Sequence, residues 1–439
     1  MKPEQKGKEA LKDSIVRSAE RLRRDPRNLF YLISGVGILL FFLLSFRFGG
    51  EIYAWMVQEN KPEIRFIDYF SHLERAAAPS ALYQQVSSGA EGSYAAVFPP
   101  LAYGMYYLLC RLTAVRGGFA PGIKMETVPG ALSVFTIYLI FNALIFFLAI
   151  GMTGQRNRKK DLLIFTLLML SAVFAGSGYM LGNSTMLVVA LLMIGLRLRE
   201  SRSAVRREAG ILILAGCVAF KLYPAVFGLV FLKEKKYREL LRFVCYSLLL
   251  LLVPFAFFGG VEGLRAWIGN FSGPLQSAGD YGRPQYLKGI FFTLIRLLTG
   301  REEAAVSTVL AVAVCLLWAW LAWRSGSRNR TLFFLICIMV FFPSGAYRYT
   351  LAYFSIPLVM LLKEEPEGKP RAWFTGPVSA LYGLLFTVPA WWLAVIPMER
   401  RFAVNTLTSV EIYLYLAAYV LIAVITAAEL TGPGLKKRG

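Results

Sequence analysis

The 439-residue chain is 56% hydrophobic and 14% aromatic, and only 17% of its residues are charged. A soluble domain could not bury so much apolar surface, so this composition excludes a soluble enzyme and predicts a polytopic integral membrane protein. The formal net charge is +21, but the basic residues gather at the N-terminus and in short loops, which is typical of membrane orientation rather than nucleic-acid binding.

The N-terminal residues 1–28 are polar and basic. Leu11, Ile15, Ala19 and Leu22 recur at helical spacing, which fits an amphipathic helix on the anionic cytoplasmic leaflet, although a solvated basic tail fits as well. Nine Lys and Arg residues precede the first apolar run, Leu29–Phe46. The N-terminus is therefore predicted to be cytoplasmic, and the first span leads to the outside.

A polar segment, residues 49–93, follows on the outside. Its stretch FIDYFSHLERAAA has helical spacing, so the first outer loop is expected to be helical. Asp68 and His72, the only histidine of the chain, would share one face of that helix. A carboxylate there can act as general base toward a hydroxyl, and an imidazole can orient it or relay a proton. A solvated pair on a loop helix also fits this spacing.

The rest of the chain continues as apolar runs, giving about ten to thirteen membrane segments. All are expected to be helical, because a lipid-exposed backbone must satisfy its own hydrogen bonds. The basic loops between the runs, and the basic C-terminal tail, should be cytoplasmic. The run 209–232 begins and ends beside basic loops, which predicts two short helices folded back on each other with a break near Phe220–Pro224. The run 94–115 should begin and end outside.

Two cations stand at such breaks. Lys221 lies about twelve residues from either end of its apolar run, and no acid occurs between Ala209 and Leu232. Its partner is therefore an acid of another segment or a ligand phosphate, and both remain open. Arg348, between Tyr347 and Tyr349, is either a headgroup anchor or a bidentate phosphate contact.

The predicted topology brings these residues together with Asp68, His72 and the Gly182–Asn183 break on the outer face, where interrupted helices line a cavity. Asp280 is a rival outer acid in a Gly-rich stretch. The sequence has no Walker loop, no GxSxG and no cluster of metal ligands, so neither a cofactor nor a metal is expected.

Four stretches, taken together, resemble glycosyltransferase family 87 in order and spacing over roughly residues 60–360. They are Asp68–Gln85, Phe98–Leu109, Ser177–Leu241, which holds a Gly-Asn break followed by Lys-x-Tyr-Pro, and Pro343–Leu358. The resemblance implies a GT-C-type transmembrane helix bundle at 29–362, followed by C-terminal transmembrane helices and a short cytoplasmic tail at 363–439.

The resemblance also implies an activity. It is the inverting transfer of a mannose-like hexose from a polyprenyl-phosphate-linked donor to a lipid or glycan acceptor, on the extracytoplasmic face of the cell membrane. Asp68 matches the position of the catalytic base, and His72 is its candidate neighbour. The residues expected at the donor phosphate are Lys221, Arg348 and Tyr349, and those expected to line the substrate cavity are Asn183, Tyr223 and Tyr347.

The chain departs from the family pattern in several places. His72 stands where relatives often carry Tyr, Phe98 replaces a Tyr before Pro-Pro, and Arg348 and Tyr349 stand near a position that is His in many relatives. The Asp-x-Asp of some GT-C loops is absent. Two alternatives are a transporter or flippase for lipid-linked glycans, and a glycan polymerase or ligase. The first usually shows a paired repeat and buried coupling acids, and the second usually carries its large outer loop late in the chain.

Overall fold

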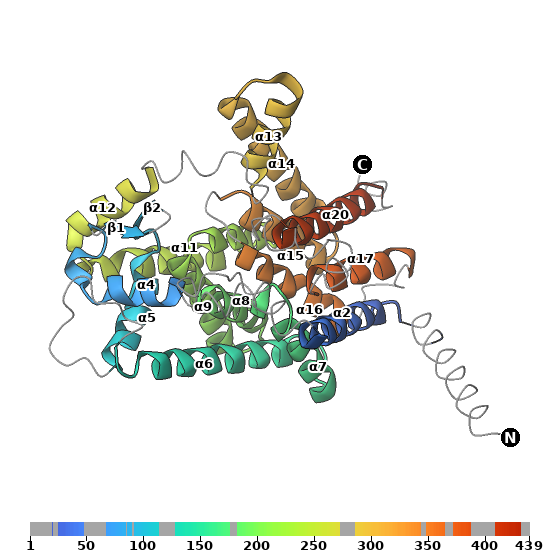
Figure 1. Ribbon diagram of the computed structural model, residues 1–439, viewed down its shortest axis with the longest axis horizontal. Coiled ribbons are helices and arrows are strands. Elements are labelled where there is room, and N and C mark those ends of the chain that lie inside the picture. Colours follow the sequence, from blue (N-terminus) through green and yellow to red (C-terminus); the bar gives the residue numbers. More distant parts are fainter. Residues whose placement is uncertain are drawn as a thin grey trace.

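The protein folds as an all-α membrane protein (Figure 1). The computed structural model describes residues 20, 25–47, 67–84, 86–89, 92–113, 128–175, 182–272, 286–343, 348–364, 372–387 and 409–431. The helices are α2 (Asn28–Arg47), α4 (Ile67–Ala76), α5 (Pro100–Arg111), α6 (Ala131–Met152), α7 (Arg158–Met169), α8 (Thr185–Leu198), α9 (Ala204–Phe220), α10 (Gly228–Lys233), α11 (Tyr237–Leu252), α12 (Gly260–Ser272), α13 (Leu287–Thr299), α14 (Ala304–Arg324), α15 (Arg328–Phe341), α16 (Ser355–Lys363), α17 (Ala372–Leu385) and α20 (Ser409–Thr431). Short 3-10 helices are η2 (Pro79–Ala81), η5 (Tyr223–Phe227), η6 (Val253–Ala256) and η8 (Arg348–Phe354).

Within the described residues, four helices are long and apolar enough to cross a membrane: Ala131–Met152, Tyr237–Ala256, Ala304–Arg324 and Tyr413–Thr431. Five shorter apolar helices accompany them. Large apolar side chains remain exposed on these helices, among them Leu144 of α6 and Leu316 of α14, each more than 60% exposed. Such surfaces suit contact with lipid, which confirms the predicted polytopic membrane protein.

The basic loops meet at one end of the molecule, here called the basic end. Arg199, just after α8, pairs with Glu234 after α10 at 2.6 Å. Arg328, at the start of α15, pairs with Glu200 at 2.7 Å. The ammonium of Lys363 at the end of α16 lies 2.6 Å from the carboxylate of Asp161 in α7. These ion pairs tie together loops that the sequence places on one side of the membrane.

The opposite end, here called the site end, holds α4, α5, α12 and a small β-hairpin, which gather at the left of Figure 1. The hairpin pairs β1 (Val86–Gly89) antiparallel with β2 (Gly92–Ala95), and the sequence analysis did not predict it. Its Gly- and Ser-rich sequence has low helix propensity, which favours an extended hairpin here. Helix α5 has only twelve residues, so it is about 18 Å long and does not cross a bilayer.

Helices α8 and α9 connect the two ends. Helix α8 runs from Thr185 at the site end to the basic end, and α9 returns from Ala204 to Phe220. The chain then breaks and continues through η5 and α10 back to the basic end, where Lys233 Nζ donates to the carbonyls of Ala322 and Ser325. The predicted break near Phe220–Pro224 is confirmed.

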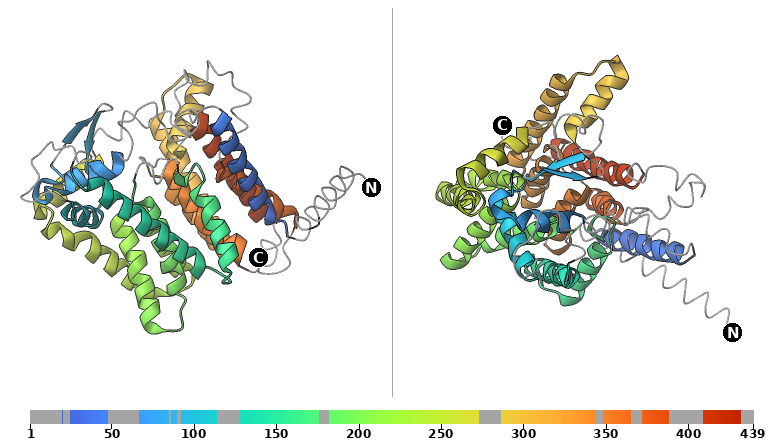
Figure 2. Two further views of the ribbon diagram at one scale, coloured as in Figure 1. Left: turned by 60° about the horizontal axis from the view of Figure 1, so that its bottom comes forward. Right: turned by 60° about the vertical axis from the view of Figure 1, so that its left-hand side comes forward.

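Helix α2 packs against α17, which also packs against α20, as Figure 2 shows. Two glycines allow the close approach of α2 and α17. A Cβ on Gly383 would lie 2.9 Å from the Cβ of Ile33, and a Cβ on Gly37 would collide with the hydroxyl of Thr387. Small residues at such crossings bring helix backbones into van der Waals contact, which is how membrane helices associate.

Candidate active site

Helix α4 presents Asp68 from the site end. One face of the helix anchors it, because Tyr69, Leu73 and Ala76 are completely buried at spacings of four and three residues. Asp68 and His72 lie four residues apart on the neighbouring face, as predicted, and Asp68 itself is partly exposed. The helix is thus fixed by its apolar face while the carboxylate stays within reach of a substrate.

The Gly-Asn break delivers Asn183 to this carboxylate. Asn183 Nδ2 donates a hydrogen bond of 2.8 Å to Asp68 Oδ2. Gly182 makes the approach possible, since its φ is +69° and a Cβ there would stand 2.5 Å from the Cβ of Tyr69. Only glycine combines that backbone conformation with so close a contact. The Gly182 break therefore brings the Asn183 amide into contact with α4.

The second break delivers Lys221. Helix α9 ends at Phe220 and Lys221 is extended, because Pro224 has no N–H with which to continue the helical hydrogen bonds. The Lys221 ammonium is 2% exposed and donates to Asn183 Oδ1 at 2.8 Å and to Thr185 Oγ1 at 2.9 Å. The sequence left the partner of Lys221 open, and the structure gives it two neutral oxygens. The Asn183 amide stands between the ammonium and the carboxylate of Asp68.

Thr185 also fixes the orientation of Asn183. Its backbone N–H donates to Asn183 Oδ1 at 3.0 Å and its hydroxyl donates to the same oxygen at 2.7 Å. Together with Lys221, three donors point at this oxygen, so a flipped amide would face them with its own N–H groups. Sequence reasoning missed Thr185. A hydroxyl two residues after a helix break, facing a buried lysine, was the available signal.

Aromatic rings surround the ammonium. Lys221 Nζ lies 4.6 Å from the ring centre of Phe98, 4.9 Å from that of Tyr349 and 5.9 Å from that of Tyr223. Ring faces stabilise a desolvated cation at such distances. The structure thus brings Asp68, Asn183, Lys221, Tyr223 and Tyr349 together. Tyr347, Asp280 and the side chain of Arg348 lie outside the described residues.

His72 lies beside this group but makes no hydrogen bond to Asp68. Its ring packs 4.6 Å from Phe98, 5.0 Å from Tyr106 and 5.6 Å from Tyr103, measured between ring centres. Burial, and then the charges of Arg75 and Lys221, hold the pKa of His72 well below its ordinary value. The imidazole is therefore neutral at neutral pH.

Burial acts on Asp68 in the other direction. Desolvation raises the pKa of Asp68, and the hydrogen bond from Asn183 and the charges of Lys221 and Arg75 oppose that rise. The net direction is upward, so Asp68 holds a proton more tightly than a solvated aspartate does. A carboxylate of raised pKa is a stronger base toward a hydroxyl.

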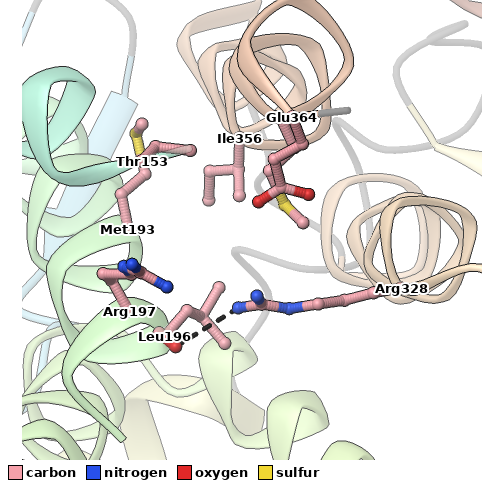
Figure 3. A pocket seen from close by; sticks show the side chains of 8 residues that line it. Thr153, Met193, Leu196, Arg197, Arg328, Ile356 and Glu364 are labelled. Carbon is pink, nitrogen blue, oxygen red and sulfur yellow. Dashed lines mark hydrogen bonds between the residues drawn. The ribbon is translucent and has the colours of Figure 1, made fainter. Parts of the chain in front are cut away.

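A separate hollow lies at the basic end, between α8, α15 and α16 (Figure 3). It is lined by Thr153, Met193, Leu196, Arg197, Arg328, Ile356, Met360 and Glu364. Arg328 crosses it to donate to the Leu196 carbonyl at 3.2 Å. Thr185 and Leu196 are at opposite ends of α8, so this hollow is not part of the Asp68 site.

The sequence profile of glycosyltransferase family 87 matches residues 125–345, which is half of the chain. The chain belongs to this family. It is therefore a membrane glycosyltransferase, an enzyme that takes a sugar donor and an acceptor in or at a membrane. A search of curated proteins finds no match.

The family match contains Asn183, Thr185 and Lys221, but it begins after Asp68 and ends before Tyr349. The family 87 core thus supplies the amide and the cation, while the flanking segments add the carboxylate and two of the three rings, those of Phe98 and Tyr349. Within the described residues no three metal-ligating side chains gather. The expectation that the enzyme needs no metal stays a prediction.

Proposed function

We propose that this family 87 enzyme is an inverting transferase that moves a mannose-like hexose from a polyprenyl-phosphate-linked donor to a lipid or glycan hydroxyl. The observation that carries the proposal is the hydrogen-bonded chain Asp68–Asn183–Lys221. Carboxylate and ammonium stand on either side of one amide and do not neutralise each other by contact. Each group keeps one position for a further hydrogen bond, since Asp68 Oδ1 and the third N–H of Lys221 have no hydrogen-bond partner among the described residues.

The reaction follows from these two groups in a GT-C-type bundle. Asp68 takes the proton of the acceptor hydroxyl as its oxygen bonds to the anomeric carbon of the donor sugar. The bond from that carbon to the phosphate oxygen breaks on the opposite face, and the electron pair leaves with the polyprenyl phosphate. That leaving group is already an anion, so cations suffice to stabilise it. Lys221 is assigned this role, and Tyr349 lies beside it. Arg348 is proposed to share this role, and Asn183, Tyr223 and Tyr347 are proposed to line the substrate cavity.

The proposed location is extracytoplasmic. The site and the basic end stand at opposite ends of α8 and α9, and positively charged loops remain in the cytoplasm. Both termini are proposed to be cytoplasmic. Arg27, before α2, donates to the Glu364 carbonyl at the basic end, and Glu429 near the end of α20 pairs with Arg330.

The test is transfer by purified protein. Radiolabelled polyprenyl-phosphate sugars are incubated with a total lipid extract of the host, and wild type is compared with Asp68→Asn. We expect label in a new product, and a loss of transfer of about a thousandfold in Asp68→Asn, because general-base catalysis contributes on this scale. Glu262→Gln is the matched control, since Glu262 is an exposed carboxylate of α12 paired with Arg265.

The outcomes separate the candidate functions. Equal transfer by wild type and Asp68→Asn would remove Asp68 as the base and move the search to Asp280. Binding of the donor without transfer would favour a flippase, which liposome flipping assays then measure. Label in a growing polymer would favour a polymerase or ligase.

A further inference from the structure

Asn183 touches both charged groups of the site, and its orientation is not adjustable. Its Nδ2 faces Asp68, while its Oδ1 receives three donors, two of them from Thr185. The amide is therefore a rigid spacer of fixed polarity between a carboxylate and an ammonium. Removing the Thr185 hydroxyl would take away one of these donors and one of the two acceptors of Lys221.

We propose that Asn183, clamped by Thr185, is a positioning residue that couples Asp68 to Lys221, so that an anionic phosphate bound at Lys221 makes Asp68 a stronger base. This inference rests on the proposed function. The ligand class is a polyprenyl phosphate or its sugar ester, recognised by its phosphate. Base strength would then rise only when the donor is in place.

The electrostatic reason is direct. The Lys221 ammonium stabilises the Asp68 anion across the amide, and a bound phosphate would offset that positive charge. The other charged or titratable groups that face Asp68 are Arg75 and the neutral His72 on its own helix, the phenols of Tyr103 and Tyr106 on α5, and that of Tyr138 on α6. The phenols are neutral at the pH of such an experiment. Among these described groups, Lys221 is linked to Asp68 through a single amide and has one N–H left for a phosphate, so its charge is the one that a donor phosphate would offset.

Infrared difference spectroscopy tests the coupling without requiring turnover. The carboxylic-acid band of Asp68, assigned by subtracting spectra of Asp68→Asn, is titrated in detergent with and without added polyprenyl phosphate. We expect its midpoint to move to higher pH by about one unit when the phosphate is present. A midpoint that does not move would overturn the proposal.

The role of the clamp is tested with Thr185→Val, which keeps the shape of the side chain and removes its hydroxyl. We expect the phosphate-induced shift to shrink by half or more and the single-turnover rate to fall about tenfold, the usual effect of one lost hydrogen bond to a charged group. Thr185→Ser should restore both. Ser379→Ala is the control, because Ser379 is a buried hydroxyl of α17, away from the site end, with no hydrogen-bond partner among the described residues.

A rate loss in Thr185→Val with an unchanged infrared shift would show a merely structural clamp and would also overturn the coupling. Failure of the proposed function looks different. In that case Asp68→Asn retains transfer, or no transfer occurs at all, while the infrared shift still reports whether phosphate and carboxylate communicate.

Discussion

The two ends of this molecule treat buried charge in opposite ways. At the basic end, opposite charges touch: Lys363 lies 2.6 Å from Asp161, and both side chains are almost completely buried. At the site end, Lys221 is equally buried, but an amide separates it from Asp68 and three aromatic rings surround it. Within the described residues, no ion pair neutralises either charge there.

This difference separates structural charges from functional ones. A direct buried pair satisfies its own charges and leaves nothing for a ligand, so its effect is on stability. A buried lysine held by neutral oxygens has no carboxylate in contact with it and keeps one N–H donor, which a substrate phosphate can use. In a membrane this difference matters more, because water cannot solvate a buried charge that loses its protein partner.

The comparison predicts its largest effect at Lys221. In Lys221→Met we expect transfer to fall about a thousandfold, equivalent to about 4 kcal/mol, because a cation facing the leaving phosphate is lost. Stability should change little, since Asn183 Oδ1 keeps both donors from Thr185. Transfer assays and unfolding in mixed micelles measure the two effects. A variant that unfolds but keeps its activity while folded would assign Lys221 to structure.

The opposite result is expected at the basic end. Lys363→Met leaves the buried carboxylate of Asp161 without its cation, which should cost about 3 kcal/mol of unfolding free energy. The folded fraction should keep its activity, because this pair is remote from Asp68. Combining Lys363→Met with Asp161→Leu should recover most of the stability. If the double variant is no more stable than the single one, the ion pair is not the cause.

A smaller loss of stability and of transfer activity should follow from Gly182→Ala. The positive φ and the contact with Tyr69 make alanine cost about 2 kcal/mol, and relief of the clash should move Asn183 away from α4. We therefore expect both reduced stability and reduced transfer, measured on the same preparation. Gly216→Ala is the control, since a Cβ there meets nothing within 4 Å.

The pH dependence should report Asp68 in wild type. Only the anion can accept a proton, so transfer should be lost as pH falls through the pKa of Asp68. Burial raises that pKa, so the loss should begin at higher pH than for a solvated aspartate, whose pKa is about 3.9. A single-turnover pH series measures the midpoint. A midpoint at or below the value of a solvated aspartate would contradict the burial argument.

His72→Phe should have the smallest effect. The imidazole packs among Phe98, Tyr103 and Tyr106, makes no hydrogen bond to Asp68 and is neutral, so a ring of similar shape should retain transfer to within about tenfold. A proton relay through His72, which the sequence suggested, instead requires a loss close to that of Asp68→Asn. The transfer assay decides between the two.

Much of the fold was accessible from the sequence, because lipid allows few backbone structures. Apolar runs predict the helices. The run 209–232 begins and ends beside basic loops on the same side of the membrane, which predicted the break after Phe220. The site was accessible only in part. Lys221 stood out because it lies in the middle of an apolar run, whereas the spacing of Asp68 and His72 fitted a solvated pair equally well. Thr185 gave only a weak signal, a hydroxyl two residues after the Asn183 break, since a threonine at a helix start is common.

The sequence by itself determined a helical membrane protein, its basic loops, and two breaks that carry Asn183 and Lys221, because hydropathy and charge are local properties of the chain. The tertiary structure decided which groups touch. It placed the Asn183 amide between Asp68 and Lys221, through two hydrogen bonds that join residues 115 and 38 positions apart in the sequence. It also packed the His72 ring among three aromatic rings. Such contacts depend on how helices pack across Gly182 and Tyr69, and no local pattern encodes that packing.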